Sequence, residues 1–261
     1  MNPGADELAV LASLPAWAFA AMLLLSRVGS ACMLLPGIGE MEVPMTVRAG
    51  FVLLLVALLL PVLLADMPAI PDDIAGMMAM LAAEIFNGIW LGWLTRMILL
   101  ALPMAGQTIA GAIGMTNVLQ PDAMLGAGAS ALQRLFGLAA PLLVLGNGLL
   151  ALPLAAVTGS YRLVAAGHVL PAGDTVNAYV GALAEAFALG FQLAAPFLMA
   201  AVLFHVSLGL LARLVPSLQT YFVAAPGQIL GGLLLLGLLG SAIIAVWMRA
   251  AEIAFAALPG L

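Results

Sequence analysis

The chain has 261 residues, of which 65% are hydrophobic and 7% charged, and its mean hydropathy is +1.22. A soluble domain carries about 25% charged residues, so the surface of this chain must face lipid or equally apolar subunits. Seven arginines, with no lysine, and twelve acidic residues give a net charge of −5. Since no basic patch exists, this composition excludes nucleic-acid binding.

Apolar runs separated by charged residues follow one another along the chain. Lipid permits only helices and closed barrels, and these runs lack the alternating pattern of barrel strands. We therefore predict an all-α protein of integral membrane type, with room for about six to eight spans. The predicted helical runs are Leu8–Ser26, Ala49–Ala65, Ile74–Thr95, Met97–Val118, Leu135–Thr158, Val176–Ala212 and Gln228–Met248.

Prolines and charges shape the predicted connections. The run Val176–Ala212 is about twice the length of one span, and Pro196 near its middle predicts a kink or a helical hairpin. Proline-containing polar segments at residues 66–73 and 162–174 predict two loops. Arg27 and Arg48 flank the first connection, which indicates that this connection faces inward and the N-terminus outward.

Small residues recur at a spacing of four in several predicted helices. This spacing lets the backbones of two helices approach closely. For any one pair the simplest interpretation is ordinary packing between helices. The pairs and triplets are Gly88/Gly92, Gly106/Ala110/Gly114 and Gly227/Gly231.

The composition offers no catalytic constellation. The two histidines, His168 and His205, lie 37 residues apart (205 − 168), and no group of metal ligands surrounds either one. No nucleophile elbow occurs, and a chain without lysine cannot form a lysine-containing phosphate loop. With a single cysteine, Cys32, no intramolecular disulfide can form. We predict that the protein is not an enzyme and binds no cofactor or metal.

Three ionisable residues lie within apolar runs and are therefore candidate functional sites. They are Glu84, Glu185 and His205. One hypothesis is a proton or ion relay through Glu84 and Glu185. The alternative is that each carboxylate forms a hydrogen bond to a neighbouring helix or faces a wet interface. Two acids without a chain of carriers make the alternative the simpler interpretation.

A polar, glycine-rich segment begins within the fourth apolar run, at Gly106. Non-helical backbone at membrane depth requires burial in protein or an aqueous cavity, and glycine permits such backbone. Two interpretations stand at this point: a soft plug that fills a cavity, or a flexible loop between helices. The candidate residues are Gly106, Gln107, Gly111, Ile113, Gly114, Met115, Thr116, Asn117, Pro121 and Asp122.

An ordered set of short motifs resembles the FliR/SctT family, the FliR-like subunits of type III secretion export gates. The matching motifs are Arg27-Val28, Pro36, Val43-Pro44, Val47-Arg48-Ala49-Gly50, Ala105-Gly106, Gly114, Asp122, Asn147-Gly148 at the head of a helix, Ser160-Tyr161, Arg213-Leu214-Val215-Pro216 and Pro226. The chain departs from the family pattern at Gln107, Pro121-Asp122, Leu149, Gln219 and Ala224. The resemblance runs over nearly the full length.

The resemblance implies kinked helices and helical hairpins assembled with FliP-like and FliQ-like subunits into a helical hetero-oligomer. It implies a FliP-like half at residues 1–174 and a FliQ-like helical hairpin at 175–261. The segment 106–122 would plug the closed channel, and displacement of this plug would admit unfolded flagellar proteins. FlhB and FlhA would be further partners, at the flagellar basal body in the bacterial inner membrane. The alternatives are the homologous injectisome subunit and a stand-alone small-molecule secondary transporter.

Overall fold

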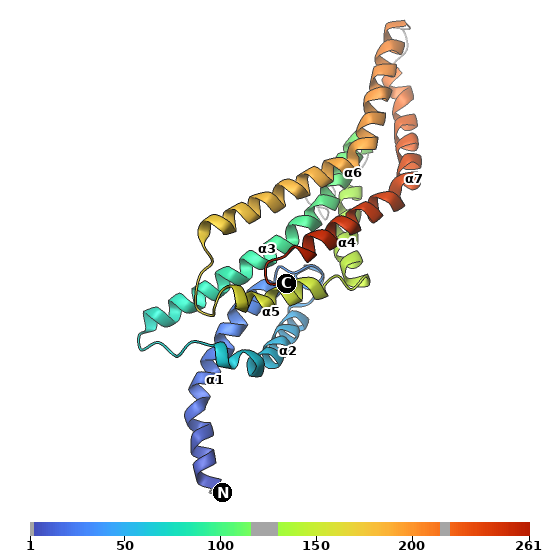
Figure 1. Ribbon diagram of the computed structural model, residues 1–261. Coiled ribbons are helices and arrows are strands. Elements are labelled where there is room, and N and C mark those ends of the chain that lie inside the picture. Colours follow the sequence, from blue (N-terminus) through green and yellow to red (C-terminus); the bar gives the residue numbers. More distant parts are fainter. Residues whose placement is uncertain (1–2, 116–129, 215–219) are drawn as a thin grey trace. The chain divides into compact units, whose positions relative to one another are not determined.

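A computed structural model describes residues 3–115, 130–214 and 220–261, and these residues form helices joined by turns and loops, with no strand among them (Figure 1). Within these described ranges, five helices are long and apolar enough to cross a membrane, and α4 with α5 adds a sixth candidate if this broken pair counts as one span. The all-α, membrane-type class is therefore confirmed. The elements are α1 (Pro3–Cys32), α2 (Met45–Leu63), the short 3-10 helix η1 (Leu64–Asp66), α3 (Ile74–Ala112), α4 (Ala131–Gly146), α5 (Ala151–Leu163), α6 (Ala172–Leu214) and α7 (Thr220–Ala256).

Two long helices, α3 and α6, are continuous where the sequence predicted a break or a possible hairpin. Helix α3 continues through Arg96, so the separate runs Ile74–Thr95 and Met97–Val118 were a wrong prediction. The guanidinium of Arg96 is satisfied outside the helix, where it binds the Leu34 carbonyl oxygen at 3.4 Å and the Glu40 carboxylate at 3.1 Å. A single charge with such partners does not end a helix.

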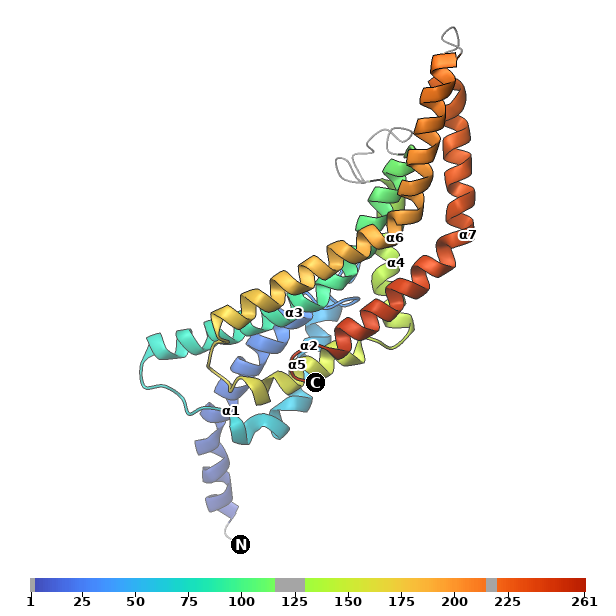
Figure 2. The same cartoon turned by 45° about the horizontal axis from the view of Figure 1, so that its top comes forward.

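Helix α6 is also continuous, with Pro196 inside it, so a hairpin within this run was wrong. A proline inside a helix removes one backbone hydrogen bond and bends the helix, but need not end it. Adjoining parts of α6 and α7 instead run side by side in opposite directions in both views (Figure 2).

The predicted run Leu135–Thr158 is broken into α4 and α5. Asn147 caps the C-terminal end of α4, and Gly148 follows with a φ of +71°. This left-handed conformation favours glycine and is a common way for a helix to stop. Asn147-Gly148 therefore ends one helix and lies two residues before the next, rather than at the head of a helix.

The described chain forms two compact units, each built from separated segments. The first comprises Met1–Arg96, Gly148–Val180 and Ala254–Leu261, and the second comprises Met97–Asn147 and Gly181–Ile253. These units describe packing within this chain. The division at residue 174 into FliP-like and FliQ-like halves concerns likeness to other subunits and remains a prediction.

The first unit has a core where α1, α2, α3 and α5 meet. Its buried members are Leu24, Val28, Ala31, Cys32, Leu35, Val52, Val56, Leu91 and Val157. Helix α3 approaches α1 closely because two glycines face it. A Cβ at Gly88 would overlap the Arg27 carbonyl, and one at Gly92 would lie 2.7 Å from Leu34 Cβ. The predicted role of this glycine pair in close helix packing is confirmed.

The second unit packs the end of α3 against α4, α6 and α7. Trp247 of α7 is fully buried and donates from its indole Nε1 to the Ile98 carbonyl oxygen at 3.1 Å. A Cβ at Gly106 would lie 2.8 Å from the Leu132 carbonyl oxygen, so this glycine permits close contact between α3 and α4. Phe197 of α6 is also buried in this unit, at 1% exposure.

Large apolar side chains cover much of the described surface of α2, α6 and α7. Leu230, Leu234 and Leu238 form a stripe on α7, and they are 62%, 63% and 77% exposed. Residues four apart lie on one face of a helix, so this stripe is continuous. Such a large apolar surface requires lipid or other subunits to cover it.

Candidate functional site

The candidate plug segment begins as helix. Gly106, Gln107 and Gly111 lie within α3, so non-helical backbone from Gly106 onward was a wrong prediction for residues 106–112. Helix α3 ends at Ala112, and Gly114 then has a φ of +78°. Ile113 and Met115 lie in this turn. The remaining candidates, Thr116, Asn117, Pro121 and Asp122, lie outside the described residues.

The end of α3 is attached to α7 by two contacts. The side-chain amide of Gln228 donates from Nε2 to the Ala112 carbonyl oxygen at 2.9 Å. Ile113 is 3% exposed and rests on Gly232, where a Cβ would overlap the isoleucine side chain. A helix leaves its last carbonyl oxygens without partners, and Gln228 satisfies one of them. These contacts position the chain at the point where the candidate plug leaves α3.

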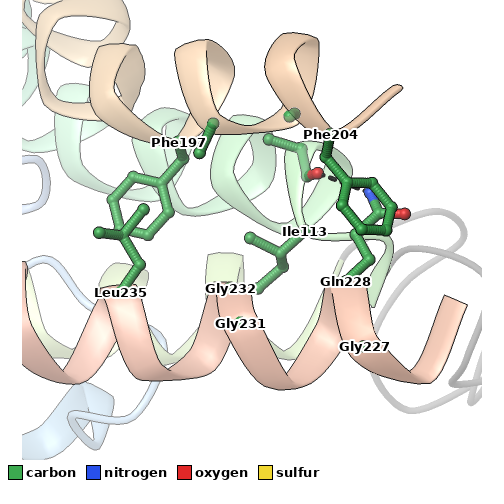
Figure 3. A pocket seen from close by; sticks show the side chains of 11 residues that line it. Ile113, Phe197, Phe204, Gly227, Gln228, Gly231, Gly232 and Leu235 are labelled. Carbon is green, nitrogen blue, oxygen red and sulfur yellow. Dashed lines mark hydrogen bonds between the residues drawn. The ribbon is translucent and has the colours of Figure 1, made fainter. Parts of the chain in front are cut away.

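Next to this attachment lies an apolar cavity of about 280 Å³. Figure 3 shows Phe197 and Phe204 on α6 facing Gly231 and Leu235 on α7, with Ile113 between them. Gln228 is the polar side chain of the lining. Hydrocarbon walls with one amide suit the packing of apolar groups and supply no acid or base.

Gln107 joins the end of α3 to the start of α4. Its side-chain Oε1 accepts the backbone N–H of Ser130 at 3.1 Å. The Ser130 hydroxyl in turn accepts the N–H of Gln133 at 3.1 Å, which is a standard N-cap. The chain on either side of residues 116–129 is therefore held by side-chain hydrogen bonds, from Gln228 before the segment and from Gln107 after it.

Glu84, the first intramembrane candidate, is completely buried and paired with Arg27, which is also completely buried. Arg27 donates from Nε to Oε2 at 2.7 Å and from Nη2 to Oε1 at 2.9 Å. Two parallel bonds of this kind are the strong, orienting form of a carboxylate–guanidinium pair. This geometry favours the alternative interpretation, a carboxylate hydrogen-bonded to a neighbouring helix.

Glu185 and His205 are exposed side chains on α6. His205 places its Nδ1 at 2.7 Å from the Ala201 carbonyl oxygen of the same helix. The two residues are 20 positions apart (205 − 185), which corresponds to about 30 Å along a helix. They therefore make no direct contact, and Glu84 belongs to the other packing unit. The relay through Glu84 and Glu185 stays a prediction.

In the described part of the chain, no three side chains of His, Cys, Asp or Glu lie close enough to hold a metal ion. The predicted absence of a cofactor rests on the sequence alone.

A model of the family described as bacterial export proteins, family 1, matches residues 18–253. The chain belongs to this family. A flagellar biosynthetic protein FliR from Caulobacter vibrioides is 30% identical over 229 residues, which cover 88% of this chain and 91% of the relative. A second flagellar biosynthetic protein FliR, from Bacillus subtilis, is 26% identical over 213 residues, which cover 80% of this chain and 81% of the relative.

Sequence reasoning missed the roles of three residues that organise this bacterial export protein. Arg27 is needed to accommodate the charge of Glu84, Asn87 is a buried polar residue, and Gln228 holds the end of α3. Each is a polar residue within or beside an apolar run, so its sequence position carried a signal. Their partners are 57 or more residues away for Arg27 and Gln228, which the sequence does not reveal.

Proposed function

We propose that this export protein is the FliR-type subunit of the flagellar type III export gate, through which unfolded flagellar proteins cross the inner membrane. The observation that carries this proposal is the extent of the match, residues 18–253, together with relatives that cover 80% or more of the chain. Both of these relatives are named flagellar biosynthetic proteins, which favours flagellar over injectisome use.

The subunit works within a hetero-oligomer with FliP-like and FliQ-like subunits, and FlhB and FlhA are its further partners. The exposed apolar surfaces of α2, α6 and α7 support this part of the proposal because water cannot cover them. In such an assembly, residues 1–174 take the place of a FliP-like subunit, and residues 175–261 form a FliQ-like hairpin.

The channel is lined in part by this subunit and is plugged by the segment 106–122. Support comes from the attachment of α3 to α7, since a plug needs a defined origin from which to close. Ile113 on Gly232 and Gln228 on the Ala112 carbonyl provide that origin. Entry of a substrate displaces residues beyond Met115, and an open and a closed arrangement of one segment is a common form of molecular switch.

The plug is tested by ion conductance of the purified assembly reconstituted in lipid bilayers. Replacement of residues 116–122 by a glycine-serine linker of equal length should raise the leak current, with subunit composition unchanged. The replacement begins after α3, because Ile109 and Ala110 of this helix are fully buried. Gln228→Leu should raise the leak in the same direction, since it removes the hydrogen bond to Ala112.

Gln192→Leu is the matched control, because Gln192 is exposed on α6. It introduces the same chemical change away from the attachment and should leave conductance unchanged. Unchanged conductance in the linker variant, in an intact assembly, would refute the plug.

The proposed assembly itself is tested by expression of the chain with and without its apolar partner subunits, followed by native mass determination. A hetero-oligomer containing this chain among several smaller helical subunits is expected. A stable assembly of this chain alone would refute the gate and support a small-molecule transporter, for which Glu84 and Glu185 would become the first residues to test.

A further inference from the structure

One face of α3 binds the backbone of the connection that follows α5. Glu84, Asn87 and Trp90 are spaced three residues apart, so they lie along one side of the helix. Glu84 Oε1 accepts the Gly167 N–H at 2.7 Å. Asn87 binds the His168 carbonyl oxygen through Nδ2 at 2.7 Å and the Leu170 N–H through Oδ1 at 3.3 Å.

Trp90 extends this set to the start of α6, where its Nε1 donates to the Thr175 carbonyl oxygen at 3.3 Å. Within residues 167–175, the partners of these three side chains are all backbone atoms, so the side chains of the connection do not enter these bonds. Val169, for example, is 56% exposed. The side chains of α3 therefore bind the backbone of the connection and are indifferent to most of its side chains.

The local conformation of the connection fits this contact. Gly167 has a φ of +84°, which glycine adopts without strain, and a Cβ there would lie 3.0 Å from Met80 Cγ on α3. The connection therefore lies directly against α3. These part-buried backbone groups lie outside any helix, and side chains of α3 provide the partners that a helix or sheet would otherwise supply.

Helix α1 holds the same connection from a second direction. Arg27 donates from Nη1 to the Val164 carbonyl oxygen at 3.1 Å and to the Ser160 hydroxyl at 3.2 Å. Its guanidinium carbon lies 4.0 Å from the centre of the Tyr161 ring, within the range of a cation–π contact. Arg27 thus offsets the charge of Glu84 and adds bonds of its own to α5 and the connection.

We propose that Arg27, Glu84, Asn87 and Trp90 form a clasp that fixes the path of residues 164–175 on α3 and thereby sets where α6 begins. In this assignment the buried carboxylate of Glu84 is a positioning group, because both of its oxygens are committed to Arg27 and one also to Gly167. The clasp belongs to the first packing unit and does not depend on the proposed plug.

Amide hydrogen exchange of the purified assembly tests the clasp, with readout at single residues. In the unaltered protein the amides of Gly167 and Leu170 should exchange slowly, although neither lies in a helix or strand, and that of the exposed Val169 should exchange faster. Asn87→Ala should speed exchange at Leu170 roughly tenfold or more, as expected when this amide loses its acceptor, Asn87 Oδ1. Asn177→Ala, at an exposed position of α6, is the matched control and should change neither amide.

Glu84→Gln separates the clasp from a proton carrier. The clasp predicts faster exchange at Gly167, because in either orientation the glutamine NH2 group faces an N–H donor of Arg27, and this repulsion moves the side chain away from the Gly167 N–H. A proton carrier predicts loss of transport with exchange at Gly167 unchanged, and that result would overturn the proposal. Should the variants fail to assemble, fast exchange at both Gly167 and Leu170 in the unaltered protein would overturn it equally.

Discussion

Removal of one partner from the buried pair Arg27–Glu84 should destabilise the protein about as much as removal of both partners. Arg27→Met leaves the Glu84 carboxylate buried with the Gly167 N–H as its remaining donor from the clasp. Glu84→Met leaves the guanidinium with two neutral acceptors, from Ser160 and Val164. An uncompensated buried charge costs about 3–5 kcal/mol, so each single substitution should lower the free energy of unfolding by this amount.

The double variant removes both charges, and an apolar pair of similar volume is close to neutral in itself. It still leaves the Gly167 N–H and the Val164 carbonyl without these partners, at about 1–3 kcal/mol each. The double variant should therefore lose about as much stability as one single variant. Additive single effects would give about 6–10 kcal/mol instead.

The assay is denaturant titration of the detergent-purified protein, followed by far-ultraviolet circular dichroism, on the two singles and the double variant. Arg162→Met is the control, because Arg162 is exposed near the same end of α5, and it should change stability by less than about 0.5 kcal/mol. A double variant whose loss equals the sum of the singles would show that the two charges do not interact and would refute this reasoning.

Further substitutions test the packing of each unit. Gly88→Leu should prevent the close approach of α3 to α1, so the melting temperature of the purified protein should fall sharply. Gly50→Ala is the control and should raise the free energy of unfolding by about 0.5–1 kcal/mol, because nothing lies within 4 Å of the added carbon; equal effects of the two variants would contradict the packing argument. Trp247→Phe should cost about 1–3 kcal/mol in the same titration, because the buried Ile98 carbonyl oxygen loses the indole N–H, and an unchanged stability would contradict that bond.

The helical content of this chain followed from composition, because lipid or equally apolar protein leaves the backbone no other partner than itself. Several local features were equally accessible. Glycines at a spacing of four indicated close packing between helices, which Gly88 and Gly92 make with α1, and proline-containing polar segments marked both loops. Asn147-Gly148 carried the signal for a helix end, which the uninterrupted apolar pattern around it concealed.

Helix ends within apolar runs were less predictable. A charge at Arg96 and a proline at Pro196 resembled boundaries, yet both lie inside continuous helices. The reason for Arg96 is tertiary, since its charge is satisfied by the connection between α1 and α2. The candidate plug was similarly placed from its composition, while contact with α4 explains why Gly106 is small although it is helical.

The sequence by itself determined that the surface faces lipid or apolar subunits, that the chain is helical, and to which family it belongs. These properties depend on residue types and on the order of short motifs. Only the tertiary structure decided the partners. Arg27 binds Glu84, 57 residues away in the sequence, and Gln228 binds Ala112, 116 residues away. The sequence around each residue does not specify which distant residue will be its partner. Such pairs depend on where helices cross and on their register, which arise from the packing of the whole unit. The role of Glu84 was for that reason open in the sequence, and it is defined by the three donors that surround its carboxylate.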